Sequence, residues 1–349
     1  MSFFGVTLEQ IGTVSPIEGA DRIEVATLRG GDFQFVIAKG SFAPGDPCLY
    51  FPVDSLVPEP VAQALGVAGK LAGAAKNRVK TIRLRGQISQ GVVAKTSIVP
   101  DDILARGPEA ITAHLGVTKY EVPEEHVQWA TLLELPDGIS VYDIEGADRY
   151  TEVAAQLLDT EVVVTEKLEG SNFSVAIRPD GQLLVNQRTK TIVPVPDGEH
   201  TFWRVARESR IVAFAHALAA KNPGKQVLVY GELFGPAIQG NYYKRPRHEV
   251  RLFDIRFGHD WLAPAAFGAA VAEFFGDATR IAVPVLFEGR LSEWLAGRSI
   301  KDASNGRSVI ADVAREGLVI RPLVEQAVRD FGRLILKQRS PEYLAKTEH

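Results

Sequence analysis

The sequence predicts an α+β protein in which a small N-terminal β-barrel precedes a larger domain built on an antiparallel sheet. Short runs of β-branched and aromatic residues fill the first 100 positions. Beyond them, strand-like runs mix with three helical stretches and show no βαβ alternation. At 349 residues the chain exceeds one average domain, so we expect two domains with separate cores.

Composition narrows the class of protein. The chain is 46% hydrophobic and 23% charged, as is ordinary for globular proteins. A single cysteine, Cys48, leaves no internal disulfide, and no Cys/His cluster has zinc spacing. No apolar run reaches membrane-spanning length and no signal-like N-terminus is present, so we expect a cytoplasmic protein with no membrane partner. A net charge of −4 means that any nucleic-acid binding must use local patches.

The N-terminal strands are predicted from their composition and from the turns between them. RIEVATLRG, FQFVIAKG and CLYFPVDSL are separated by Gly30-Gly31 and Pro44-Gly45. An Ala/Gly-rich helix is expected from about Pro60 to Ala75, and strands resume in KNRVKTIRLRGQISQGVVAK. Strands with one inserted helix are typical of the OB fold, which often carries a nucleic-acid-binding face.

A basic stripe is expected after that helix. Lys76, Arg78 and Lys80 recur with period two and would share one strand face, and Arg83 and Arg85 continue the pattern after a one-residue shift. No acidic residue occurs between Pro60 and Pro100. Two interpretations stay open: a solvated edge strand protected by its charges, or a contact to a phosphate backbone.

The proline-punctuated segment KYEVPEEHVQ is expected to link the domains, with the boundary near Glu124, giving domains 1–124 and 125–349. The second domain should contain helices near 202–221, 265–275 and 291–296. Its hairpin FSVAIRPDGQLLVNQR is closed by Pro179-Asp180-Gly181, which indicates an antiparallel sheet. No glycine-rich phosphate loop of the dinucleotide or P-loop type occurs.

TEKLEGSNF places Lys167 at the end of an apolar strand, just before Gly170. By itself this pattern also fits a solvated lysine paired with Glu169. Five further stretches, each in or beside a predicted strand, follow in order: VNQRTK with Arg188, VLVYGELFG with Glu232, VRLFDIRF with Phe253, REGLVIRP with Glu316 and LILKQRSPEYL with Lys337.

These six stretches, in this order, resemble the nucleotidyltransferase motifs of the covalent lysyl-AMP superfamily of polynucleotide ligases and capping enzymes. The resemblance covers roughly Gln128 to Tyr343, and EKLEGSNF is most similar to the RNA ligases. The N-terminal module and the short C-terminal end further resemble Deinococcus-type RNA ligases, which carry an OB domain ahead of the catalytic one. The resemblance implies an antiparallel-sheet, ATP-grasp-like ligase fold for the second domain.

The resemblance also implies roles for single residues. Lys167 would bond to AMP, Glu166 would help to read the base, and Arg188 and Glu232 would hold the ribose and its phosphate end. Glu316 would be the metal-proximal carboxylate for Mg²⁺ or Mn²⁺. Asn172 would help to place the nucleic-acid ends.

Two further assignments each have a physical argument of their own. Lys337 and Arg339 lie two apart, so a strand points both to one face, where they could neutralise the α-phosphate and the expelled pyrophosphate. An amphipathic edge strand is the alternative. Phe253 would stack on adenine, although it also alternates with Ile255 and Phe257 as core residues do.

An amine must be neutral to attack phosphorus, and deprotonating an ordinary lysine at pH 7 costs roughly 4 to 5 kcal/mol. Nearby cations reduce that cost. Three positions depart from the commonest pattern: Glu169 replaces aspartate, and Arg321 and Arg339 replace lysines. Glu169 would by itself favour the ammonium form of Lys167.

The expected function is that of an ATP-dependent RNA ligase that adenylylates itself, transfers AMP to a 5′-phosphate and seals nicks with an RNA 3′-hydroxyl strand, in RNA repair. The expected partner is a nicked duplex, with a monomer favoured. A DNA ligase, a GTP-using capping enzyme and a non-catalytic OB-type RNA-binding protein are the alternatives. The first two normally carry an OB domain after the last motif, whereas this sequence ends ten residues after Arg339.

Overall fold

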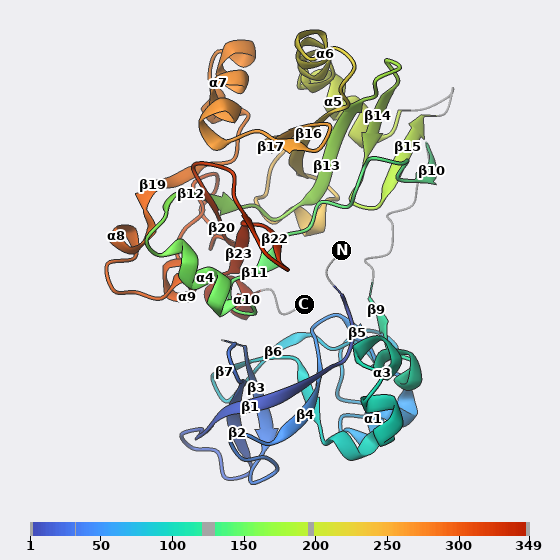
Figure 1. The fold of residues 1–349 in the computed structure, drawn as a ribbon, viewed down its shortest axis with the longest axis vertical. Coiled ribbons are helices and arrows are strands. Elements are labelled where there is room, and N and C mark those ends of the chain that lie inside the picture. The colour runs from blue at the N-terminus through green and yellow to red at the C-terminus, as the bar shows by residue number, and fades with distance from the viewer. Residues whose placement is uncertain (1–2, 32, 121–129, 195–198, 347–349) are drawn as a thin grey trace. The chain divides into compact units, whose positions relative to one another are not determined.

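A computed structural model describes residues 3–31, 33–120, 130–194 and 199–346, which fold into two compact units (Figure 1). The first unit comprises residues 1–123, 147–152 and 344–349, and the second comprises 124–146 and 153–343. The predicted linker lies mostly at 121–129, outside the described residues. The domain boundary near Glu124 therefore stays a prediction.

The first unit is built on a five-stranded antiparallel sheet in the order β3-β2-β1-β4-β8. Its strands are β1 (Thr7–Pro16), β2 (Ile23–Leu28), β3 (Gln34–Ala38), β4 (Pro47–Phe51) and β8 (Val92–Ala94). The hairpin of β6 (Thr81–Leu84) and β7 (Gln87–Gln90) continues beyond β3, where the Val36 amide donates a 3.0 Å hydrogen bond to Ser89 Oγ. A short pair, β5 (Ser55–Leu56) with β9 (Thr118–Lys119), completes the unit. The predicted β-barrel is confirmed.

The helix predicted from Pro60 to Ala75 is wrong in length. Helix α1 covers only Glu59–Ala64, and Gly66, Gly69 and Gly73 follow with positive φ angles of 68°, 71° and 81°. Glycine adopts this left-handed region freely, so the glycines that seemed part of a helix end it instead. The expectation of one inserted helix is also wrong, because α2 (Asp101–Leu104), α3 (Pro108–Leu115) and the 3₁₀ turn η1 (Thr96–Ile98) belong to the same unit.

The predicted strand face for Lys76, Arg78 and Lys80 is wrong as well. Lys76 has a φ of 50°, and no regular strand runs from 76 to 80. The chain there bonds across to the segment before α1: the Val79 amide donates to the Ser55 carbonyl, and the Val57 amide to the Asn77 carbonyl, both at 2.8 Å. Arg83 lies on β6, and Arg85, with a φ of 48°, lies in the turn that follows.

The second unit contains a seven-stranded antiparallel sheet in the order β10-β15-β14-β13-β16-β17-β18. Its strands are β10 (Ala130–Glu134), β13 (Ser171–Ile177), β14 (Leu183–Asn186), β15 (Lys190–Pro194), β16 (Val227–Phe234), β17 (Glu249–Phe257) and β18 (Asp260–Trp261). The predicted hairpin of β13 and β14 is confirmed, with Gly181 at a φ of 85° in its turn.

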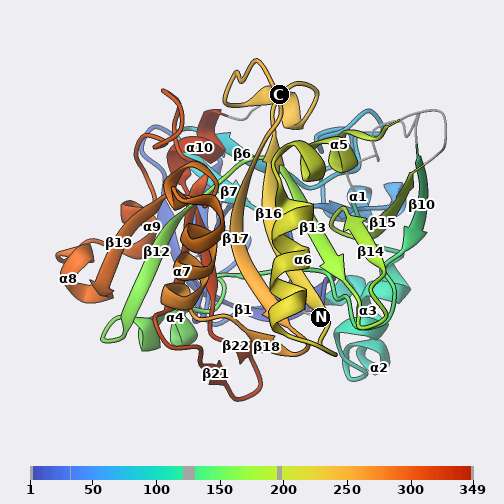
Figure 2. The ribbon, with the colours of Figure 1, turned by 90° about the horizontal axis from the view of Figure 1, so that it is seen from above.

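Three helices cover one face of this sheet: α5 (Thr201–Glu208), α6 (Ile211–Lys221) and α7 (Pro264–Phe275) (Figure 2). Phe202, Phe214 and Phe267 from the helices share one buried core with Val175 and Val229 from the strands. Two of the three predicted helical stretches lie here, and the first is split at Arg210, whose φ of 65° is left-handed.

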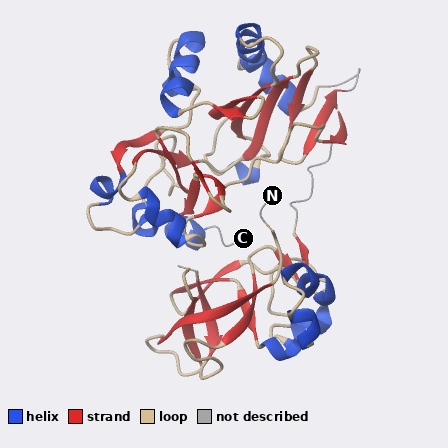
Figure 3. Ribbon diagram, viewed as in Figure 1, coloured by secondary structure: helices blue, strands red, loops and turns tan. Residues whose placement is uncertain are grey.

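A second, five-stranded sheet belongs to the second unit, in the order β11-β23-β20-β12-β19. Figure 3 draws the strands of both sheets in red. Its strands are β11 (Glu145–Gly146), β12 (Glu161–Lys167), β19 (Val285–Arg290), β20 (Gly317–Pro322) and β23 (Leu336–Arg339). Strand β12 is antiparallel to both neighbours, and β11 is parallel to β23. The predicted helix near 291–296 is α8 (Leu291–Leu295), whereas α4 (Thr151–Leu157), α9 (Ile300–Ala303) and α10 (Pro341–Lys346) were not expected.

Candidate active site

Lys167 ends β12 and pairs with Gly317 at the start of β20. This register brings Glu316 beside the amine, and Lys167 Nζ donates a 2.6 Å hydrogen bond to Glu316 Oε1. The two side chains are 25% and 5% exposed. Burial lowers the pKa of Lys167, but the charges of Glu316, Glu232 and Glu169 and the bond to Glu316 outweigh it, so the pKa is raised. The isolated protein therefore holds this amine as an ammonium.

Gly170 lets the turn after Lys167 approach β16 closely. A Cβ atom at this position would lie 2.4 Å from the Leu233 carbonyl oxygen and 3.0 Å from Glu232 Cγ. Asn172 lies directly opposite Glu232 across the β13–β16 pair. Burial raises the pKa of Glu232 to about 8, an effect that Lys167 opposes and that Glu316 and Glu169 reinforce. The motif glycine thus brings a third carboxylate into the electrostatic field of the amine.

Two cations lie on β23 beside β20. Lys337 and Arg339 occupy alternate positions and so point to one face of the strand. Burial lowers the pKa of Lys337, and the charges of Lys167, Arg188 and Arg339 act in the same direction, against that of Asp143. Arg339 Nε lies 3.9 Å from Glu316 Oε1. Three positive groups, Lys337, Arg339 and Arg188, are therefore gathered near the candidate nucleophile.

Asp143 joins two of these cations, and its sequence context gave no sign of it. Arg188 Nη2 donates a 2.9 Å hydrogen bond to Asp143 Oδ2, and Lys337 Nζ lies 3.5 Å from Asp143 Oδ1. The three residues come from distant parts of the chain. The parallel pairing of β11 with β23 brings Asp143 near Lys337, and Arg188 reaches the same carboxylate from the turn between β14 and β15.

Phe253 does not belong to the helix-covered core. The β16–β17 register shifts between Tyr230 and Gly231, so that Tyr230 pairs with Asp254 and Gly231 with Leu252. This bulge makes Phe253 the extra residue and breaks the alternation expected with Ile255 and Phe257. Its ring lies 4.9 Å, between centroids, from that of Tyr142.

Glu166 points away from Lys167 and is only 1% exposed. Its Oε2 accepts a 2.8 Å hydrogen bond from the Val309 amide, while its buried Oε1 has no hydrogen-bond partner among the described residues. Burial raises the pKa of Glu166, although the bonds from Ser308 and Val309 oppose the shift. An unfilled buried acceptor is costly unless a ligand or water supplies a donor.

Arg321 is separated from the amine by the length of its strand. It lies five residues after Glu316 on an extended chain, so roughly 16 Å of strand separates the backbones of the two residues. Its guanidinium donates a 2.9 Å hydrogen bond to Asp254, a fully buried carboxylate that also pairs with Arg333 at 2.6 Å. Tyr142 Oη donates to the same carboxylate at 2.9 Å. Arg321 is therefore part of a buried ion-pair cluster.

The predicted nucleic-acid residues of the first unit divide into two groups. Arg78 pairs with Asp54 at 2.6 Å and lies 3.5 Å above the centroid of the Tyr120 ring. Lys80 is half-buried, whereas Lys76, Arg83 and Arg85 are exposed. Arg78 thus has a structural partner within its own unit.

Two tyrosines not expected from the sequence hold Glu169. Its amide donates a 2.7 Å hydrogen bond to Tyr243 Oη, and Tyr343 Oη donates a 2.5 Å hydrogen bond to its Oε2. Burial raises the pKa of Glu169 to about 7, with Glu316 acting in the same direction and Lys167 against it. The adjacent pair Tyr242-Tyr243 was the only sequence signal.

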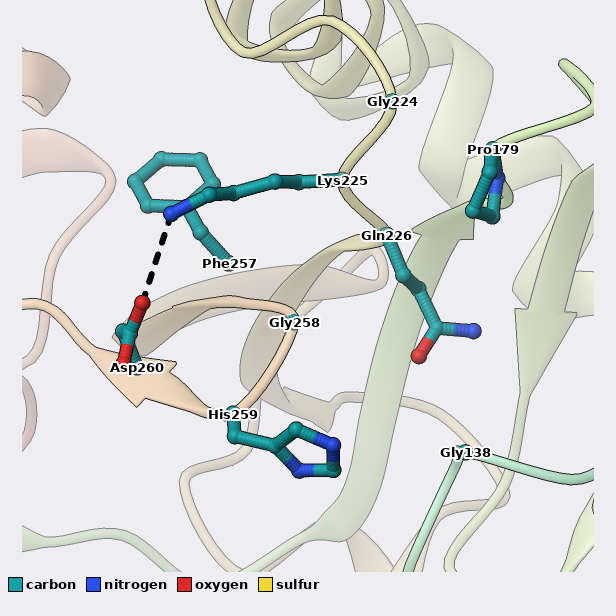
Figure 4. Close-up of a pocket in the computed structure, with 9 residues that line it drawn as sticks. All are labelled: Gly138, Pro179, Gly224, Lys225, Gln226, Phe257, Gly258, His259 and Asp260. Carbon is teal, nitrogen blue, oxygen red and sulfur yellow. Dashed lines mark hydrogen bonds and ion pairs between the residues drawn. The ribbon is translucent and has the colours of Figure 1, made fainter.

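A hollow of about 430 Å³ lies elsewhere, at the end of the seven-stranded sheet where β16 begins and β17 ends (Figure 4). Gly138, Gln226 and His259 line it, with the ion pair of Lys225 and Asp260 at 3.3 Å on its wall. Phe257, at the end of one motif stretch, lines this hollow, but none of the candidate site residues does. It is a surface feature separate from the lysine site.

The described carboxylates around Lys167 supply some of the oxygen ligands that a hard divalent cation needs. Within the described ranges, no three histidine, cysteine, aspartate or glutamate side chains form a ready-made metal cluster. Glu316 Oε2 is nevertheless buried without a hydrogen-bond partner among those residues. Because Mg²⁺ commonly binds through one or two carboxylates and keeps several waters, this donor set fits such an ion.

An N-terminal barrel joined to an antiparallel-sheet domain with a buried motif lysine is the architecture of a nucleotidyltransferase-type ligase. Family comparison agrees: residues 160–339 match the RNA ligase family and residues 5–96 match an OB-fold domain. The chain belongs to the RNA ligase family. The expected family, the OB fold and the α+β class are confirmed.

Solved structures of an RNA ligase from Naegleria gruberi are similar over nearly the whole chain. An apo mutant is 27% identical with a TM-score of 0.81, covering 97% of this chain and 96% of that one. A mutant with ATP and Mn, at 27% identity, has a TM-score of 0.79 and coverages of 97% and 98%. A complex with PPi, also 27% identical, has a TM-score of 0.80 and coverages of 98% for both chains. A search of curated protein sequences gives no match. No helix in the described ranges is long and apolar enough to cross a membrane.

Proposed function

We propose that this RNA ligase is ATP-dependent, becomes adenylylated on Lys167 and seals nicks that have an RNA 3′-hydroxyl strand. The observation that carries the proposal is the placement of the Lys167 amine against Glu316, beside Lys337 and Arg339. We further propose a monomeric, cytoplasmic enzyme of RNA repair. The Naegleria structures with ATP and Mn, and with AMP and Mn, support the choice of nucleotide and metal.

In the first step, the Lys167 nitrogen attacks the α-phosphorus of ATP. A nitrogen–phosphorus bond forms, the bond to the bridging oxygen of the β-phosphate breaks, and pyrophosphate leaves. Lys167 must first lose the proton that it shares with Glu316, which costs roughly 4 to 5 kcal/mol at pH 7 for an ordinary amine. Lys337 and Arg339 offset the negative charge that gathers on the phosphates.

A Mg²⁺ or Mn²⁺ ion, when bound, would supply positive charge that opposes the carboxylates and makes the neutral amine accessible. Glu316 would hold the ion, directly or through its waters, because its Oε2 is a buried oxygen with no other described partner. Glu232 would hold a ribose hydroxyl, and Arg188 the phosphate end of the nucleotide.

Recognition of adenine is assigned to the pair Phe253 and Glu166. Phe253 lies at the bulge of β17, outside the helix-covered core, where its ring can stack on a base. The unpaired Glu166 Oε1 is a buried acceptor suited to an amino group. Stacking on Phe253 suits either purine, whereas the acceptor fits adenine better than guanine, whose edge carries an oxygen at the corresponding position.

Two in-line displacements complete the reaction. The 5′-phosphate of the nick attacks the lysyl-AMP and releases Lys167, and then the 3′-hydroxyl attacks the activated phosphate and releases AMP. Asn172, opposite Glu232, would place the nucleic-acid ends. Residues 1–124 would form the domain that grips the duplex through Lys76, Arg83 and Arg85, and residues 125–349 the catalytic domain.

The decisive experiment is incubation with α-labelled ATP and Mn²⁺. The full chain should retain label after denaturation, Lys167→Ala should retain none, and Lys221→Ala, which changes an exposed lysine paired with Glu273, should label normally. A nick-sealing assay with RNA or DNA on each side of the break then separates RNA ligation from the DNA-ligase alternative. Unlabelled wild-type protein would instead favour a non-catalytic RNA-binding protein.

A further inference from the structure

Glu169 lies two residues after the candidate nucleophile and is held at two atoms. Its backbone N–H donates to Tyr243 Oη at 2.7 Å, and its Oε2 accepts from Tyr343 Oη at 2.5 Å. Tyr243 comes from the loop between β16 and β17, and Tyr343 comes from α10. The backbone bond fixes the turn, and the side-chain bond fixes the direction of the carboxylate.

Both tyrosines are themselves rigidly placed. Tyr243 and Tyr343 are 4% and 3% exposed. Tyr242 packs edge-on against both rings, with centroid distances of 5.3 and 5.4 Å, and donates a 2.7 Å hydrogen bond to the Ala314 carbonyl. At the start of α10 the Tyr343 amide donates a 3.2 Å hydrogen bond to Ser340 Oγ. The Tyr343 hydroxyl is therefore a fixed donor.

The direction of this carboxylate matters because Lys167 has competing partners. Its ammonium is bonded to Glu316 and is also attracted by Glu169. A glutamate side chain has several rotatable bonds, so an untethered Glu169 could turn towards the ammonium and form a second ion pair. Such a pair would turn the amine towards Glu169 and away from its position against Glu316.

We propose that Tyr343 is a positioning residue for lysyl-AMP formation, which holds the Glu169 carboxylate away from the Lys167 amine. The inference rests on the proposed role of Lys167 as nucleophile. The glutamate side chain, one methylene longer than that of aspartate, reaches the hydroxyl of Tyr343. Tyr343, on α10, thereby acts on the first chemical step through Glu169.

The test is the single-turnover rate of lysyl-AMP formation as a function of ATP concentration, with Mn²⁺ present, for Tyr343→Phe in the full chain. Tyr343→Phe removes a hydrogen bond to a charged group, so the rate at saturating ATP should fall roughly 10- to 100-fold. Half-saturating ATP should change by less than about threefold. The matched control is Tyr50→Phe, which deletes a buried hydroxyl that donates to the Gln90 carbonyl at 2.7 Å in the first unit; its labelling rate should equal that of the wild type.

A double-mutant cycle between Tyr343 and Glu169 distinguishes a positioning role of Tyr343 from a general effect on the structure. Glu169→Asp keeps the charge but shortens the side chain, so it should show a similar rate loss, and adding Tyr343→Phe to it should change the rate by less than about twofold. An equal loss from Tyr343→Phe in both backgrounds would overturn the inference. A wild-type rate in Tyr343→Phe, with Lys167→Ala unlabelled, would also overturn it and leave the proposed function intact. A wild-type chain that takes no label would refute the proposed function itself.

Discussion

Lys167 Nζ and Glu316 Oε1 lie 2.6 Å apart although 149 residues separate them in the chain. The antiparallel register of β12 and β20, which pairs Lys167 with Gly317, produces this contact. In the protein without nucleotide or metal, this ion pair keeps the amine unreactive until a positive charge, such as a metal ion, opposes the charge of the carboxylate. Several measurable consequences follow from it and from its surroundings.

The pH dependence of Lys167 reactivity should show its raised pKa. In metal-free protein, acylation of this amine by a small reagent should increase about tenfold per pH unit and reach no plateau by pH 10, because the ammonium persists to higher pH than in a free lysine. Peptide mass spectrometry reads the modification, with exposed Lys221 as internal control. Adding Mn²⁺ should move the curve to lower pH. A plateau below pH 8 without metal would contradict the ion-pair account.

In metal-free protein, the contribution of Glu232 to stability should fall as pH rises from about 4.5 to 8. Glu232, whose pKa is raised from 4.5 to about 8, binds more protons in the folded state than in the unfolded state throughout this window, so the free energy of unfolding falls with pH. Urea titrations should show the Glu232→Gln variant gaining on the order of 1 to 2 kcal/mol relative to wild type between pH 5 and 8. A pH-independent difference between the two proteins would refute the assignment.

The Asp254 cluster should behave as a structural element. Replacing Asp254 by Asn leaves Arg321 and Arg333 buried without their shared carboxylate, so the free energy of unfolding should fall by about 3 kcal/mol or more. Asp260→Asn, at a surface pair with Lys225, should change it by less than about 1 kcal/mol. Equal effects in chemical denaturation would show that the cluster does not bear on stability.

Arg83 should affect nucleic-acid binding, whereas Arg78 should affect the stability of the fold. Arg83→Ala, at an exposed position of β6, should weaken duplex binding at all sequences and reduce the slope of log K against log salt by about 1. Arg78→Ala breaks the pair with Asp54 and the contact with Tyr120, and should lower stability by about 1 kcal/mol while leaving the salt slope unchanged. Fluorescence anisotropy across a salt series measures both slopes.

Gly170→Ala should lower the rate of self-adenylylation by at least about 100-fold. The added Cβ would meet the Leu233 carbonyl at 2.4 Å, so the turn after Lys167 must separate from β16 and from Glu232. Gly268→Ala in α7, where a Cβ meets no atom within 4 Å, should label normally and gain about 0.5 to 1 kcal/mol of stability. Normal labelling of Gly170→Ala would exclude close approach as the reason for this glycine.

Local sequence patterns predicted the strands, the hairpin at Pro179-Asp180-Gly181 and the ordered motif set, because these depend on side-chain period and turn chemistry. They failed where glycine decided between helix and turn, at residues 66–73, and where main-chain hydrogen bonds to a distant segment overrode the period, at 76–80. Within the site, Lys167, Glu316 and Lys337 were predictable from their motifs. Asp143 and Tyr343 were not, since their contacts arise only from the pairing of strands and helices far apart in the chain.

The order of strands in the five-stranded sheet also has a consequence for synthesis. The candidate nucleophile Lys167 lies on β12, while its neighbours β19 and β20, and β23 on the far side of β20, come later in the chain. The whole seven-stranded sheet and Lys167 are therefore translated before Glu316, Lys337 and Arg339. A nascent polypeptide lacks Lys337 and Arg339, the proposed partners of the ATP phosphates, until β23 has been made, so we expect that unfinished chains do not form lysyl-AMP.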